Sequence, residues 1–170
     1  MKTIALLAAS LMPLALAAQA PAPASKSELA PFRWFADLAG ACWRGDHPDG
    51  KTGDIQCYST QYGRFVRGTI KVYKQPDPKA VVFEGDSVFG WDAKGSRMVY
   101  TQWASNGSIT PAQEAYWDGE ILRFGARDAK DATVRSSWQK EGKDGFKVVR
   151  ERKEGPLWKE VFAVTYRRAP

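Results

Sequence analysis

Hydrophobic and polar positions alternate along most of this chain. From position 41 onward, about ten short segments carry apolar or aromatic residues at every second position, and Gly, Asp, Asn or Pro residues bound each of them. The segments are 41–45, 53–60, 62–73, 80–91, 97–104, 108–117, 120–126, 132–139, 146–152 and 157–168. A period of two is typical of β-strands that bury one face. Short Gly- and Asp-containing loops indicate antiparallel strands that neighbour one another in sequence order.

An up-and-down sheet of this size has two open edges unless it closes on itself. Closure into a barrel removes both edges. We therefore predict an all-β fold, an up-and-down antiparallel β-barrel of about ten strands. A β-sandwich is the alternative architecture.

The segment 28–38 has a different period. Leu29, Phe32, Phe35 and Leu38 fall near helical spacing and form one apolar stripe. We expect a short helix here, with Ser27 as its N-cap. The barrel offers this helix one place to bury its aromatic residues, so we expect it to cover one end.

The first twenty residues have the pattern of a secretory signal peptide. Lys2 is followed by an apolar run from 4 to 16 and by the small-residue site Ala18-Gln19-Ala20. We expect residues 1–20 to be removed, 21–27 to form a flexible linker rich in Pro, Ala and Ser, and 28–170 to form one domain. The expected compartment is the periplasm, with full secretion as the alternative, and no transmembrane segment is expected in the mature chain.

Charge argues for a soluble exported protein and not for a nucleic-acid partner. The chain carries a formal charge of +6, and removal of Lys2 with no acidic residue lowers it to +5. Basic and acidic residues are mixed along the strands, which is typical of solvated faces. No nucleic acid is expected in an exported setting. Weak contact with an anionic envelope surface is the remaining interpretation of the excess positive charge.

The two cysteines are predicted to form a disulfide. A two-residue turn centred on Asp49-Gly50 pairs residues whose numbers add up to 99, and Cys42 and Cys57 satisfy that sum. Two opposed cysteines in an oxidising compartment are most simply a disulfide. The strict register makes them a hydrogen-bonded pair with wider spacing, and a longer loop would relieve this. A redox or metal site is the rival interpretation, without the ligand spacing that such sites use.

Several short motifs carry a family resemblance. The stretch 35–45, which reads Phe-Ala-Asp-Leu-Ala-Gly-Ala-Cys-Trp-Arg-Gly, is similar to the opening of the calycin superfamily, and the chain resembles lipocalin-like bacterial exported families of unknown function. The stretches 88–92 and 100–103 resemble their middle strands. True lipocalins have Gly-x-Trp, whereas two residues separate Gly40 from Trp43 here. The resemblance implies a ligand-holding barrel in which Arg167 or Arg168 packs over Trp43 by cation–π attraction.

A second resemblance concerns haem. The stretch 43–48 is similar to nitrobindin-like haem barrels, which bind haem through a histidine late in the chain. The single histidine here is His47, in the first hairpin, and Tyr166 is the alternative axial ligand. We expect His47 to be a solvent-facing turn residue and expect no cofactor and no metal.

The sequence contains no catalytic motif that we recognise. It has no Gly-x-Ser-x-Gly elbow, phosphate-binding loop or metal-ligand cluster. Glu84 and Asp86 share one strand face, and charge on the barrel exterior is their expected role. We expect the protein not to be an enzyme, with an isomerase or hydrolase as the third function class.

Aromatic residues on the middle strands lead to the functional expectation. A wide barrel leaves interior space, and small-molecule pockets use apolar walls with a few polar groups. We expect Trp103, Trp138 and Arg150 to line a cavity, with the Arg150 guanidinium pairing an acidic head group. The predicted function is an exported protein that binds a small apolar or amphipathic molecule. The alternative is an envelope interaction protein with a filled barrel that docks to a protein or an anionic lipid surface.

Overall fold

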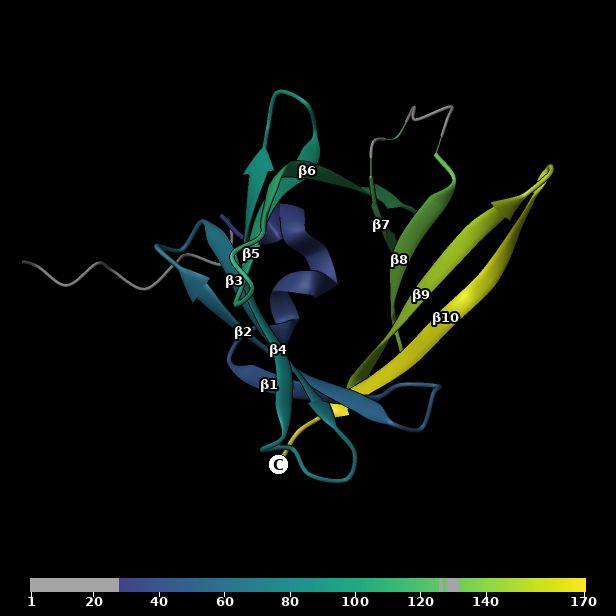
Figure 1. The fold of residues 1–170 in the computed structure, drawn as a ribbon. Helices are drawn as coiled ribbons and strands as arrows, with labels where there is room; N and C mark the ends of the chain where they lie inside the picture. The colour runs from purple at the N-terminus through teal and green to yellow at the C-terminus, as the bar shows by residue number, and fades with distance from the viewer. Residues whose placement is uncertain (1–27, 126, 128–131) are drawn as a thin grey trace, which may run out of the picture.

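The chain forms a closed antiparallel β-barrel with one short helix across one end (Figure 1). The structure is a computed structural model, and it describes residues 28–125, 127 and 132–170. The predicted signal peptide, the linker at 21–27 and the Ser27 cap lie outside the described residues. The predicted fold class is confirmed, and one continuous closed sheet replaces the sandwich alternative.

Each strand pairs with its neighbours in sequence, and the first strand pairs with the last. The strands are β1 (Ala41–Asp46), β2 (Thr52–Gln61), β3 (Phe65–Lys74), β4 (Val81–Asp92), β5 (Arg97–Ala104), β6 (Ile109–Asp118), β7 (Ile121–Phe124), β8 (Val134–Lys140), β9 (Gly145–Glu154) and β10 (Leu157–Arg168). These bounds follow the predicted segments closely, because alternating side chains and turn residues determine both. β1 and β10 are joined by only three residue pairs, from Trp43–Arg168 to Gly45–Tyr166.

The short helix expected over 28–38 is present as a 3-10 helix, η1 (Ala30–Leu38). Its backbone breaks at Arg33, where φ is 49° and ψ is −136°. The buried residues Phe32, Phe35 and Leu38 recur every third position. That spacing matches the three residues per turn of a 3-10 helix, whereas an α-helix has 3.6.

Indole hydrogen bonds fix η1 across one end of the barrel. The Trp34 Nε1–H donates to the Glu120 carbonyl at 2.9 Å, and the Trp117 Nε1–H donates to the Pro31 carbonyl at 3.0 Å. The Trp43 Nε1–H donates to the Leu38 carbonyl at 3.0 Å. Buried carbonyls at the helix therefore have partners, which such groups need. The predicted position of the helix over one end is confirmed.

Phe35 is the central contact between η1 and the barrel wall. Its fully buried ring lies 4.9 Å from Phe89, 5.6 Å from Tyr58 and 5.7 Å from Trp138, measured between ring centroids. These three residues belong to β4, β2 and β8. One helix side chain thus joins strands from well-separated parts of the closed sheet.

The predicted disulfide between Cys42 and Cys57 is confirmed, and the two residues are directly opposite in the β1–β2 register. The connecting loop is longer than the predicted two-residue turn, because the His47 N–H donates to the Thr52 carbonyl at 3.0 Å. That bond makes 47–52 a hydrogen-bonded pair, so 42–57 is a closely spaced, non-hydrogen-bonded one. The Cα atoms are 3.9 Å apart. A disulfide of this kind fits an extracytoplasmic protein.

No helix in the part of the chain that the structure describes is long and apolar enough to cross a membrane.

We expect the disulfide to contribute about 3 kcal/mol to the free energy of unfolding, because it closes a loop of 15 residues in the unfolded chain. The double variant Cys42→Ser/Cys57→Ser should lose this amount in urea denaturation. Reduction of the wild-type protein should produce a similar loss and should leave the variant unchanged. Equal stability of the oxidised and reduced wild-type proteins would contradict this expectation.

Candidate functional site

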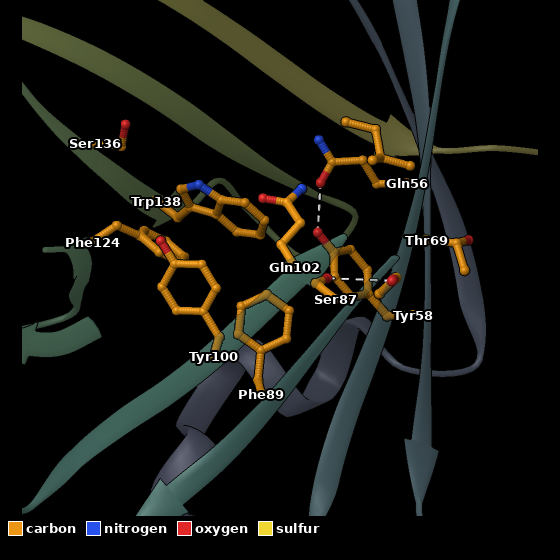
Figure 2. Close-up of a pocket in the computed structure, with 12 residues that line it drawn as sticks. Gln56, Tyr58, Thr69, Ser87, Phe89, Tyr100, Gln102, Phe124, Ser136 and Trp138 are labelled. Atoms are coloured by element: carbon orange, nitrogen blue, oxygen red, sulfur yellow. Dashed lines mark hydrogen bonds between the residues drawn. The ribbon is translucent and has the colours of Figure 1, made fainter. Parts of the chain in front are cut away.

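A cavity of about 210 Å³ lies inside the barrel (Figure 2), and three of the residues that line it, Tyr58, Phe89 and Trp138, pack on Phe35 of η1. No described helix or strand crosses the opposite end of the barrel (Figure 1). The cavity is lined by Gln56, Tyr58, Gly68, Thr69, Ile70, Ser87, Phe89, Tyr100, Gln102, Phe124, Ser136 and Trp138. These residues come from β2, β3, β4, β5, β7 and β8. The cavity is therefore a product of closure, because no pair of adjacent strands could form it.

Aromatic rings form one side of the cavity. Phe89 and Tyr100 are stacked with centroids 5.3 Å apart, and Phe124 meets Tyr100 edge-on at 5.3 Å. Trp138 lies 5.1 Å from Phe124 and is stacked on Phe146 at 5.2 Å. Contacts of this kind between rings stabilise their orientation beyond simple burial. The result is a preformed apolar wall.

Uncharged polar groups form the other side. The Tyr58 hydroxyl donates to Gln56 Oε1 at 2.5 Å, and the Ser87 hydroxyl donates to the Gly68 carbonyl at 3.3 Å (Figure 2). Among the described residues, none hydrogen-bonds the side chains of Gln102 or Ser136. Small-molecule sites commonly combine apolar walls with a few polar groups of this kind.

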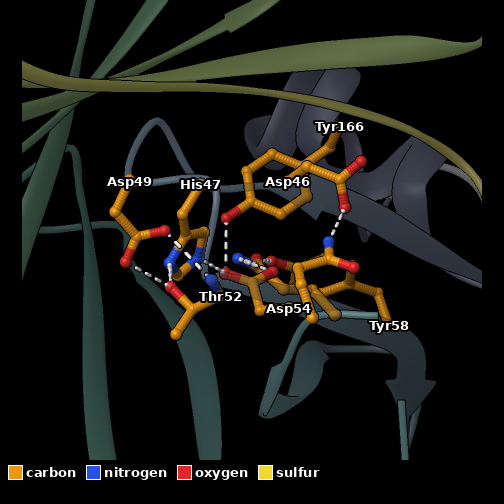
Figure 3. A network of polar contacts seen from close by, with 9 residues as sticks. Asp46, His47, Asp49, Thr52, Asp54, Tyr58 and Tyr166 are labelled. Atoms are coloured by element: carbon orange, nitrogen blue, oxygen red, sulfur yellow. Dashed lines mark hydrogen bonds and ion pairs between the residues drawn. The ribbon is translucent and has the colours of Figure 1, made fainter. Parts of the chain in front are cut away.

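A buried polar network lies behind Gln56 and reaches the β1–β2 hairpin (Figure 3). Its centre is Asp54, which is 3% exposed. Asp54 Oδ2 lies 2.9 Å from His47 Nε2 and accepts a hydrogen bond from the Tyr166 hydroxyl at 2.7 Å. Asp54 Oδ1 accepts from Gln56 Nε2 at 3.4 Å. The network therefore connects a loop histidine to a residue that lines the cavity.

The hydrogen positions in this network follow from the count of donors. The Thr52 hydroxyl donates to Asp49 Oδ2 at 2.9 Å, and it also lies 2.8 Å from His47 Nδ1. Because the hydroxyl has one hydrogen, Nδ1 must then donate to Thr52. The contact between His47 Nε2 and Asp54 needs one further proton, on either the ring or the carboxyl.

Burial raises the pKa of Asp54 above its ordinary value of 3.8, against the opposing effect of the hydrogen bonds from His47 and Tyr166. Burial also raises the pKa of Tyr58, to which the negative charge of Asp54 adds. Both shifts have the same physical origin, since a charged form loses its hydration inside the barrel. The Tyr58 hydroxyl therefore acts as a hydrogen-bond donor and not as a base.

The three residues expected to line one cavity do not lie together. Trp138 lines the cavity. Trp103 does not, because the inward face of β5 carries Met98, Tyr100 and Gln102, and Trp103 points outward with 37% of its surface exposed. Arg150 occupies an inward-facing register position opposite Ser136, yet its side chain is exposed and is not part of the lining.

Other residues singled out in the sequence have clear positions. Arg168 lies 5.7 Å from the Trp43 ring centroid, so the cation–π contact that the family resemblance implied is confirmed for this residue. Glu84 and Asp86 form exterior ion pairs with Lys71 and Arg67, in agreement with exterior charge. The expectation that His47 faces solvent is wrong, since its side chain is 16% exposed and bonded to Asp54.

Sequence reasoning missed the polar residues Asp54, Gln56 and Gln102, and it named Tyr166 only as an alternative haem ligand. A signal was available for two of them. The Cys42–Cys57 register places Gln56 opposite Trp43, and Asp54 shares the face of Gln56. Polar residues at period two on a strand face that bears a buried indole indicate an interior polar network. Gln102 has no comparable signal, because both faces of β5 carry aromatic residues.

Comparison of the sequence with protein-family models and with curated proteins gives no match.

We expect the stability contributed by Asp54 to fall as pH rises through the acid range. A carboxyl whose pKa is raised by folding stabilises the fold fully below the pKa of the unfolded chain, and this contribution is lost as pH rises through the folded pKa. Asp54→Asn keeps the shape and cannot titrate. The free energy of unfolding of the wild-type protein minus that of the variant should therefore be larger at pH 3.0 than at pH 5.5. Urea denaturation at both pH values measures it, and a difference that increases with pH would contradict the expected sign.

Proposed function

We propose that this protein binds a small apolar or amphipathic molecule inside its barrel. The observation that carries the proposal is the cavity inside the barrel, with rings on one side and amides and hydroxyls on the other. Its volume is below the roughly 300–1,000 Å³ of pockets for drug-sized ligands. The ligand, or the part of it that enters, is therefore small.

The size is still sufficient for an aromatic ring. An engineered apolar cavity of about 150 Å³ takes up benzene. A preformed wall reduces the cost of ordering side chains on binding. Both facts favour uptake of a ring-sized group by the wall of Phe89, Tyr100, Phe124 and Trp138.

Export to the periplasm, or full secretion, is part of the proposal. It rests on the pattern of residues 1–20 and on the disulfide, which is characteristic of oxidising compartments. In such a compartment the barrel acts as a carrier or sensor and not as an enzyme, since the chain offers no recognisable catalytic motif. The relation to calycins is proposed on the same basis, from the motifs at 35–45 and the Arg168–Trp43 contact.

Tryptophan emission tests the proposal directly. We expect toluene, as an apolar probe, and geraniol, as an amphipathic one, to cause saturable changes in emission. Ser136→Leu places a larger side chain in the cavity, so the affinity of the protein for both probes should fall at least tenfold. Its melting temperature reports whether the fold is retained.

The two tryptophans with opposite positions provide a matched pair. Trp138→Phe should remove most of the probe-dependent emission change, because this indole lines the cavity. Trp103→Phe should leave the change intact, because Trp103 lies on the outer face. Equal effects of the two substitutions, or no response to either probe, would refute binding inside the barrel and favour the filled-barrel docking protein.

A further inference from the structure

The polar half of the cavity contains no charged side chain. Each of the twelve lining residues is neutral, and the buried carboxyl of Asp54 is hydrogen-bonded to one of them, Gln56. The Arg150 guanidinium, the group expected to pair an acidic ligand, is exposed and outside the lining. A carboxylate that entered this space would lose its hydration without gaining a counter-ion, which is costly. The cavity therefore selects against anions.

Gln56 has a fixed orientation. Its Oε1 accepts from Tyr58 at 2.5 Å, and its Nε2 donates to Asp54 at 3.4 Å. The two flanking partners decide which end of the amide is oxygen and which is nitrogen. Tyr166 and His47 hold Asp54 in turn, so the orientation is set by a chain of buried groups. This amide is engaged at both ends and is part of the wall.

Gln102 differs in this respect. Its amide projects into the cavity between Trp138 and the Gln56–Tyr58 pair (Figure 2), and no described residue forms a hydrogen bond with it. Its cross-strand neighbours are Ser87 and Thr110. Ser87 donates its hydroxyl hydrogen to the Gly68 carbonyl at 3.3 Å. A primary amide has an acceptor and two donors, and all of them remain available to a ligand here.

We propose that Gln102 makes the cavity selective for aromatic or apolar molecules that carry a neutral carboxamide or lactam group. This inference rests on the proposed function. A carboxamide presents one acceptor and one donor side by side, so it can form two antiparallel hydrogen bonds with the Gln102 amide while its apolar part lies against Trp138. A carboxylate presents two acceptors, one of which faces the Gln102 oxygen with no hydrogen between them. The arrangement recognises the amide and rejects the acid of the same shape.

Three ligands of nearly equal size test the selectivity: benzamide, benzoate and toluene. Isothermal calorimetry at neutral pH with the full folded protein measures each affinity. We expect benzamide to bind at least tenfold more tightly than benzoate and about tenfold more tightly than toluene, the scale of two additional net hydrogen bonds.

Gln102→Met removes the amide and keeps the length of the side chain. In this variant we expect the affinity for benzamide to lie within about threefold of the affinity for toluene. The affinity for toluene should equal or exceed that of the wild-type protein. Gln139→Met is the matched control, because Gln139 follows Trp138 on the opposite face of β8. It should leave all three affinities unchanged. Retained toluene binding by Gln102→Met also shows that this variant folds.

The outcomes separate the two proposals. If toluene binds and benzamide has no advantage, or if Gln102→Met retains the advantage, the amide selectivity is wrong and the cavity-binding function stands. If benzoate binds most tightly and Arg150→Met weakens it, the acidic head group expected from the sequence replaces the amide. If none of the three ligands binds, both proposals fail.

Discussion

Closure of a ten-stranded sheet is the constraint on which the rest of the structure depends. A barrel of this width encloses more space than its own inward side chains fill, in contrast to narrow barrels whose interiors are solid. The helix η1 fills one end with Phe32, Trp34, Phe35 and Leu38, which are all buried. The remaining space is lined by residues from six strands, three of which pack on Phe35 of η1. The buried helix and the cavity are therefore two results of the same geometry.

The interior is divided between two kinds of chemistry. Rings from β4, β5, β7 and β8 pack against one another and need no partner beyond dispersion and burial. The groups from β2 are polar, and each is satisfied by the next, from Tyr58 through Gln56 to Asp54. A buried network of this type is stable only when it is complete, since each unpaired member would carry a desolvation cost. Gln102 and Ser136 depart from this pattern, because no described residue forms a hydrogen bond with their side chains.

The sequence predicted the architecture well because the information is local. Alternation over 81–92 and turn residues such as Asp118-Gly119 define strands without reference to the rest of the chain. The site is less accessible to such reasoning. On β5, Tyr100 and Trp103 lie on opposite faces, and only the pairing with β4 decides which face is inside. The His47–Asp54 contact depends on the length of the hairpin loop, which a Gly-containing turn does not specify. Which side chains face the interior, and which of them meet, therefore depends on the register between strands and not on composition.

The pairing of β1 with β10, the seam of the barrel, bears on the order in which the strands pair during folding. All other pairings join strands adjacent in sequence, whereas the three residue pairs of the seam join opposite ends of the barrel sequence. Contacts between distant residues carry the largest loop-closure entropy and form late. We therefore expect the hairpins to assemble first as a curved open sheet, and the first and last strands to meet at the end. The lumen does not exist before that step, so a ligand can be enclosed only by a chain that has finished folding.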